Sequence, residues 1–135
     1  MRFPSSVSIR VVEESAVYAA IGEDGFTRLI HAFYTQVPSD PVLGPMYPEG
    51  DFAGAEERLR NFLIYRFGGP QRYVEERGHP RLRMRHAPFP VDDRARQHWL
   101  MLMHNAVEQA GFPAEVRDVL CTYFESTAAA MMNRL

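Results

Sequence analysis

The segment from Gly78 to Pro90 gathers residue types that could bind an anionic ligand. It contains three arginines, two histidines and three prolines. Each proline lacks an amide hydrogen and disfavours helix in the residue before it, so only a short turn from about Arg81 to His86 can form. We interpret the segment as a clamp for an anionic group, with His86 held at its end. The alternative is a solvated basic surface, the commoner role of such a charge run.

The histidines and the cysteine exclude most metal sites. The five histidines are His31, His79, His86, His98 and His104, and no two of them are spaced i, i+4 as in a two-histidine zinc face. The single cysteine, Cys121, excludes an intrachain disulfide, a Cys-x-x-Cys metal site and covalent haem attachment. A cofactor that needs only one protein ligand is compatible with this pattern, and haem iron is the common example.

A haem site makes three demands that this sequence can meet. It needs one neutral histidine, for which His86 is the candidate. It needs apolar walls, for which the candidates are Phe62, Leu63, Leu82, Phe89 and Met103. It needs cations at the rim for the propionates, and Arg58 and Arg85 could supply them. Tyr34 and Trp99 lie on apolar helix faces and could donate hydrogen bonds to a bound diatomic ligand.

Each of these residues has a purely structural alternative. A tryptophan on an apolar stripe is by default a core residue, and a tyrosine there is by default half-buried with its hydroxyl at the surface. A single histidine is more often a surface or core residue than a ligand. Helical periodicity by itself therefore indicates a helical domain with an anion or cofactor site, and no more.

Length and composition favour one small domain. The chain has 135 residues, 46% of them hydrophobic, and a formal net charge of −2. This size predicts a single domain, and the charge gives no bulk attraction to nucleic acid or membranes. No signal peptide and no apolar run long enough to span a membrane is recognisable, so the expected location is the cytoplasm.

The elements that must position these residues are helices, so the predicted class is all-α. Residues 1–14 are expected to form an N-terminal arm, and residues 15–135 the domain. Apolar residues at helical spacing predict a short helix over 15–21 and longer ones starting near residues 24, 51, 92 and 113. The expected stops are Gly22, Pro38, the Gly68-Gly69-Pro70 run, Gly111 and about Asn133.

With these residues in view, the sequence resembles the group II truncated haemoglobins, the two-on-two bacterial globins. The similarity runs from about Val17 to the C-terminus. The matching motifs are Ala32-Phe33-Tyr34-Thr35-Gln36-Val37, the stretch from Tyr47 to Arg60, Gly68-Gly69-Pro70, the stretch from Arg77 to Phe89, and Trp99-Leu100. The family typically has tryptophan where this chain has Phe67. The resemblance implies a globin-like two-over-two helical sandwich enclosing haem b (iron protoporphyrin IX).

The resemblance also implies a role for each site residue. His86 would be the proximal ligand of the haem iron, and Tyr34, Tyr47 and Trp99 would be distal hydrogen-bond donors. Ala55 would occupy the position where classical globins place the distal histidine, so that position would be apolar. The distal walls would be Leu59, Phe62 and Leu63, and the propionate partners would be Arg58 and Arg85, with Tyr73 and His79 as weaker candidates.

The expected function is binding of O2, NO and CO at a five-coordinate ferrous iron. A cage of donors slows ligand escape, which suits redox or detoxifying chemistry such as NO dioxygenation or peroxide reduction, supported by an unidentified reductase. The alternatives are oxygen storage or sensing without turnover, and a haem-free helical interaction module. No nucleic acid or membrane partner is expected, and a homodimer is left open.

Overall fold

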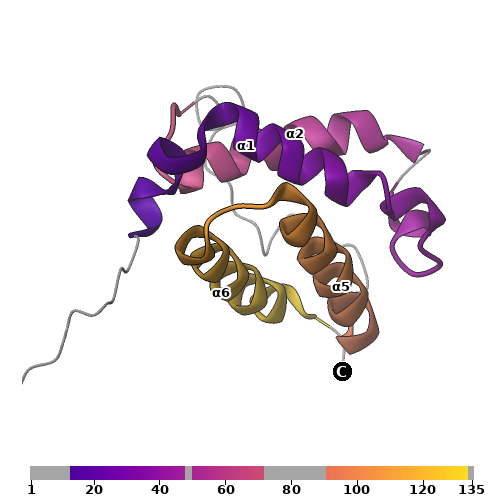
Figure 1. Cartoon of the computed structure of the whole chain (residues 1–135). Helices are drawn as coiled ribbons and strands as arrows, with labels where there is room; N and C mark the ends of the chain where they lie inside the picture. Colours follow the sequence, from indigo (N-terminus) through magenta and orange to yellow (C-terminus); the bar gives the residue numbers. More distant parts are fainter. Residues whose placement is uncertain (1–12, 48–49, 72–90, 134–135) are drawn as a thin grey trace, which may run out of the picture.

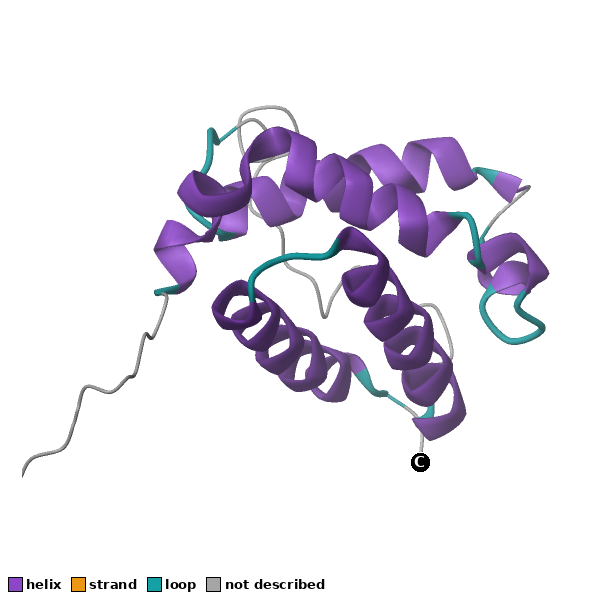
Figure 2. Cartoon of the chain, in the orientation of Figure 1, coloured by secondary structure: helices purple, strands orange, loops and turns teal. Residues whose placement is uncertain are grey.

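The computed structural model describes residues 13–47, 50–71 and 91–133. This part of the chain consists of helices and loops without strands (Figure 2), which confirms the predicted all-α class. The α-helices are α1 (Val17–Tyr34), α2 (Phe52–Arg66), α5 (Asp93–Ala110) and α6 (Ala114–Met131). Three short 3-10 helices in the same residues are η1 (Glu14–Ala16), η2 (Val37–Ser39) and η3 (Gly44–Met46).

The four α-helices form two layers. In Figure 1, α1 and α2 run side by side as one layer, and α5 and α6 form the second layer beneath them. Helix α1 contacts both α2 and α5, and α5 contacts α6. This is the predicted two-over-two arrangement. None of the helices in the described residues is long and apolar enough to cross a membrane.

A glycine breaks α1 where the sequence predicts a boundary between two helices. Gly22 has a φ of 69°, a conformation that residues with a β-carbon rarely adopt, and it interrupts the helical backbone inside α1. The segment before it corresponds to the predicted short helix, and the segment after it carries Tyr34 at its end. Glu14, at the end of the predicted arm, pairs with Arg66 at 2.8 Å between Oε1 and Nη2.

Side-chain and glycine caps define the other helix ends. The Asp51 carboxylate accepts a hydrogen bond from the Gly54 amide at 3.1 Å, and the Asp92 carboxylate accepts one from the Ala95 amide at 2.8 Å. Such caps satisfy amides that have no partner within the helix. Gly111 ends α5 in the left-handed conformation, with a φ of 68°. These contacts confirm the predicted starts of α2 and α5 and the predicted end of α5.

Aromatic rings pack part of the space between the layers. Phe26, Phe33, Phe67 and Phe124 are fully buried. The Phe67 ring lies with its centroid 6.0 Å from that of Phe26 and 5.0 Å from that of Tyr123. Phe67 therefore fills the interior position at which the resembled family has the larger tryptophan.

Candidate functional site

A cavity of about 380 Å³ lies between the helix layers. Its lining residues come from the end of α1, the corner that includes η3, and helices α2, α5 and α6. They are Tyr34, Leu43, Met46, Tyr47, Asp51, Ala55, Arg58, Leu59, Phe62, Leu63, Val91, Ala95, Arg96, Trp99, Tyr123, Phe124, Thr127, Ala128 and Met131. Most of these side chains are apolar, and the polar ones are few, as is usual for a site that binds an organic cofactor.

Eight of the residues that the sequence singles out meet at this cavity. They are Tyr34, Tyr47, Ala55, Arg58, Leu59, Phe62, Leu63 and Trp99. Met103 is the exception: it is fully buried in the hydrophobic core and does not line the cavity. Helix α5 packs against both α1 and α6, and residue 103 is enclosed by that packing. Tyr73, His79, Leu82, Arg85, His86 and Phe89 lie outside the described residues, so their roles remain predictions.

Tyr34 and Tyr47 present a pair of hydroxyls to the cavity. Their oxygens lie 3.4 Å apart, and their ring centroids are 5.7 Å apart in an edge-on arrangement. Since one hydroxyl donates to the other, the hydrogen of the accepting hydroxyl stays available for a ligand. The pair can therefore offer a donor that is already oriented by its neighbour.

Burial keeps both hydroxyls protonated. Burial raises the pKa of Tyr34 far above its ordinary value, and the neighbouring Tyr47 raises it further, while the Arg58 charge lowers it slightly. Burial also raises the pKa of Tyr47, although its hydrogen bond with Tyr34 and the charge of Arg58 each lower that pKa in part. Both side chains are thus neutral hydrogen-bond donors throughout the physiological pH range.

This burial predicts a loss of stability at high pH. The chain contains no lysine, so tyrosine ionisation dominates its titration at alkaline pH. The folded pKa of Tyr34 exceeds the unfolded value near 10.0, so its contribution to stability is complete below about pH 10 and is lost as the pH rises further. We expect the free energy of unfolding, measured in urea, to fall less steeply above about pH 10 in Tyr34→Phe than in the wild type. If the free energy of unfolding falls equally steeply with pH in the two proteins, this prediction is wrong.

Trp99 adds a further donor to the same cavity. Its ring packs against Phe33 and Phe124, with centroid distances of 5.5 and 5.6 Å. In residues 13–47, 50–71 and 91–133, no hydrogen-bond partner is found for its indole N–H. A core tryptophan usually satisfies this group with a carbonyl. As far as the described residues go, the indole N–H is therefore available to donate to a ligand.

Two arginines stand at the cavity margin. Arg58 has 41% of its side chain exposed and a loose contact with Asp51, at 3.4 Å between Nη2 and Oδ2. Arg96 binds Asp93 more tightly, at 2.7 Å between Nη2 and Oδ1. Arg58 is the cation predicted for the rim. Arg96 was not predicted as a site residue, because its spacing of three from Asp93 on a helix is typical of a surface ion pair.

None of the α6 residues that line the cavity was predicted as a site residue. Tyr123, Phe124, Thr127, Ala128 and Met131 line it from that helix. Their spacing of three and four residues marks an inward face, but the same spacing would serve a filled core.

Comparison with known proteins identifies the family. A model of the bacterial-like globins matches residues 16–133. The group 2 truncated hemoglobin YjbI of Bacillus subtilis is 39% identical over 120 residues, covering 89% of this chain and 90% of the relative. This chain belongs to the group II truncated haemoglobins.

Solved structures agree with the assignment of this globin. The haemoglobin of Thermobifida fusca is 50% identical, with a TM-score of 0.84 over 87% of this chain and 96% of that chain. The haemoglobin of Chloroflexus aurantiacus is 48% identical, with a TM-score of 0.84 over 87% of this chain and 98% of that one. A truncated oxygen-avid haemoglobin of Bacillus subtilis is 39% identical, with a TM-score of 0.82 over 87% and 98% of the two chains.

The cavity of this globin fits the cofactor of its family, haem b. Haem has a flat apolar ring and two carboxylates at one edge, and it binds diatomic gases. Leu59, Phe62 and Leu63 supply apolar surface, and Arg58 supplies a positive charge at the margin. The cavity volume of about 380 Å³ lies within the range of small-molecule sites. The family assignment and this fit together make gas binding at haem the general function.

Proposed function

We propose that this globin retains O2 tightly and uses it in redox or detoxifying chemistry, such as NO dioxygenation or peroxide reduction. The proposal rests on one observation: the Tyr34 and Tyr47 hydroxyls and an indole N–H without a partner in the described residues line the same cavity. Haem, when bound, supplies a ferrous iron that coordinates the diatomic ligand and can pass it an electron. His86, outside the described residues, is the proposed proximal ligand.

In this proposal the chain's side chains bind, orient and shield the ligand. Tyr34 and Tyr47 are both neutral donors, and Trp99 donates from α5, so negative charge that develops on the ligand meets preorganised dipoles. Leu59, Phe62 and Leu63 are apolar and exclude water, which strengthens these hydrogen bonds. Ala55 adds no polar group of its own.

Arg58 is the proposed partner of a haem propionate. Among the described residues, its guanidinium makes only the 3.4 Å contact with Asp51, which is weak enough to be exchanged for a stronger bidentate bond to a carboxylate. Arg85 is proposed for the second propionate from its place in the sequence.

Tight retention favours turnover over delivery. A protein that releases O2 slowly is a poor carrier, but it keeps the gas in place long enough for a second reactant to arrive. Conversion of NO and O2 to nitrate consumes an electron, so a reductase must restore the ferrous state in each cycle. The oxygen-avid relative is consistent with this reading.

Removal of a donor should accelerate O2 release. We expect Tyr34→Phe, Tyr47→Phe and Trp99→Phe each to raise the O2 dissociation rate about 5- to 150-fold, because a lost donor costs roughly 1–3 kcal/mol in a dry site. Rapid mixing of the oxygenated protein with excess CO measures this rate. Tyr65→Phe is the matched control, since it removes a tyrosine hydroxyl from α2 that does not line the cavity.

The outcome also separates the proposed redox role from storage or sensing. Fast release from the wild type, or an unchanged rate in Trp99→Phe, would rule out the donor cage. If release is slow, the oxygenated protein should oxidise NO to nitrate faster than a simple oxygen carrier does, and a reductase should sustain the reaction over repeated cycles. A protein that retains O2 but does not consume NO or peroxide would instead support storage.

A further inference from the structure

Asp40 organises the corner that leads from η2 to Tyr47. Its side chain is only 5% exposed. Oδ1 accepts hydrogen bonds from the amides of Val42 and Leu43, both at 2.9 Å. The carboxylate therefore fixes the turn from which η3 begins. Leu43, Met46 and Tyr47 of this corner all line the cavity.

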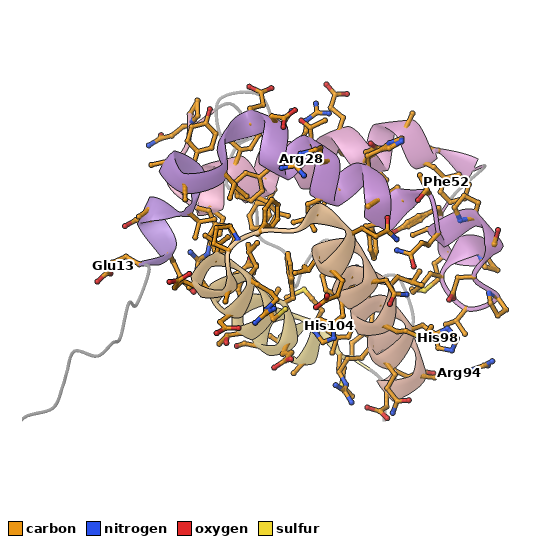
Figure 3. All side chains as sticks on the ribbon, in the orientation of Figure 1. Glu13, Arg28, Phe52, Arg94, His98 and His104 are labelled. Carbon is orange, nitrogen blue, oxygen red and sulfur yellow. The ribbon has the colours of Figure 1, made fainter. Side chains whose placement is uncertain are left out.

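The same carboxylate reaches across to helix α5. Nδ1 of His98 lies 2.9 Å from Oδ2 and 3.1 Å from Oδ1 of Asp40. Burial alone would raise the pKa of Asp40, but the hydrogen bonds from His98 and from the Leu43 and Val42 amides outweigh it, so the pKa is lowered. Asp40 is thus a charged acceptor at neutral pH. In Figure 3, His98 lies on the side of α5 towards the corner, and His104 lies nearer to α6.

This contact joins two elements that carry ligand donors. His98 immediately precedes Trp99, and Asp40 holds the turn that precedes Tyr47. Two other hydrogen bonds link these regions through Gln36: its Nε2 donates to the Leu102 carbonyl at 2.9 Å, and its Oε1 accepts from Asn105 Nδ2 at 3.1 Å. Gln36 lies before η2, so these bonds do not hold the corner itself. A shift of the corner relative to α5 would change the distance between the Tyr47 hydroxyl and the Trp99 indole.

We propose that Asp40 and His98 are positioning residues that set the location of the Tyr47 hydroxyl relative to the Trp99 N–H in the ligand site. The inference rests on the proposed function, since it assumes that both groups donate to the ligand. It assigns a role in ligand retention to two residues that do not line the cavity. The competing interpretation is that the pair only stabilises the fold.

A double-mutant cycle distinguishes positioning from stability alone. We expect His98→Leu to raise the O2 dissociation rate of the haem-loaded protein about 5-fold or more, since the Tyr47 donor is no longer held in place. The infrared C–O stretching band of the ferrous CO complex, which reports donors near the ligand, should broaden or shift in the direction seen for Tyr47→Phe. In a Tyr47→Phe background, His98→Leu should have no further effect on either measurement.

Three further variants sharpen the test. His98→Asn places an amide nitrogen the same number of bonds from the backbone as Nδ1, so it should restore a rate close to the wild type. His104→Leu is the control, because His104 is also on α5 but contacts Glu125 of α6, at 3.5 Å. If His98→Leu does not fold, Asp40→Asn takes its place: it keeps an oxygen for the two amides and removes the charge that His98 faces.

The negative results separate a failure of the positioning role from a failure of the proposed function. If Tyr47→Phe and Trp99→Phe accelerate release but His98→Leu and Asp40→Asn leave the rate and the infrared band unchanged, the positioning role is refuted and the donor cage stands. An equal effect of His98→Leu with and without the Tyr47 hydroxyl would also refute it. If neither donor variant changes O2 release, the proposed function itself fails, and the positioning role with it.

Discussion

Replacement of His86 by alanine is expected to abolish stable haem binding. In the proposed site this imidazole is the only covalent connection between the iron and the chain, and the remaining contacts are apolar surface and rim charges. Purified His86→Ala should lack a Soret band, and hemin added to it should be lost on gel filtration. Exogenous imidazole should restore the band, because it can occupy the vacated ligand position.

The control for this experiment is a histidine outside the cavity. His31 is 66% exposed and contacts Glu56 at 3.0 Å between Nδ1 and Oε2. His31→Ala should therefore keep a full complement of haem. Haem occupancy in His86→Ala equal to that of the wild type, without imidazole, would refute the proximal assignment. A wild-type protein that never acquires a Soret band with hemin would support the haem-free interaction module.

Local signals in the sequence were enough to predict the α-helices, with one error: α1 ends at Tyr34, before the predicted stop at Pro38, which lies within η2. The caps at Asp51 and Asp92, the stop at Gly111 and the break at Gly22 each depend on a few neighbouring residues. A cap or a positive φ places strong demands on one residue type, so its position can be read from the chain. Helical periodicity then supplied the inward faces.

Periodicity could not separate a cavity wall from a filled core. Met103 and Trp99 are four residues apart on the same face of α5, yet only Trp99 lines the cavity. Phe124 lines the cavity from a face that would read equally well as core. The difference arises from how the layers cross, which depends on contacts between residues far apart in the chain. The meeting of Tyr34 with Trp99 was predicted through family resemblance rather than from spacing.

Some tertiary contacts have no sequence signal at all. Asp40 and His98 are separated by 58 positions, and neither belongs to a recognisable motif. The close approach of the first helix to the end of α2 is of the same kind: the amide of Tyr18 donates to the carbonyl of Phe67 at 3.0 Å. The run Gly68-Gly69-Pro70 predicts a helix stop, but it does not reveal that another backbone lies against it.

That approach makes Gly68 a position where a small substitution should strongly destabilise the fold. Gly68 has a φ of 99°, and a β-carbon added there would overlap the backbone carbonyl oxygen of Ser15. A backbone atom cannot rotate away as a flexible side chain can. We expect Gly68→Ala to lower the free energy of unfolding by roughly 3–5 kcal/mol, the sum of the strain at positive φ and the overlap. Urea unfolding followed by circular dichroism measures it.

Gly111→Ala isolates the contribution of the overlap. Gly111 also has a positive φ, 68°, but a β-carbon there would meet nothing within 4 Å. It should therefore lose only the cost of the backbone conformation, about 1–2 kcal/mol. Equal losses in the two variants would show that the contact with Ser15 relaxes freely. A larger loss at Gly68 means that the backbone around Ser15 is held rigidly against the end of α2.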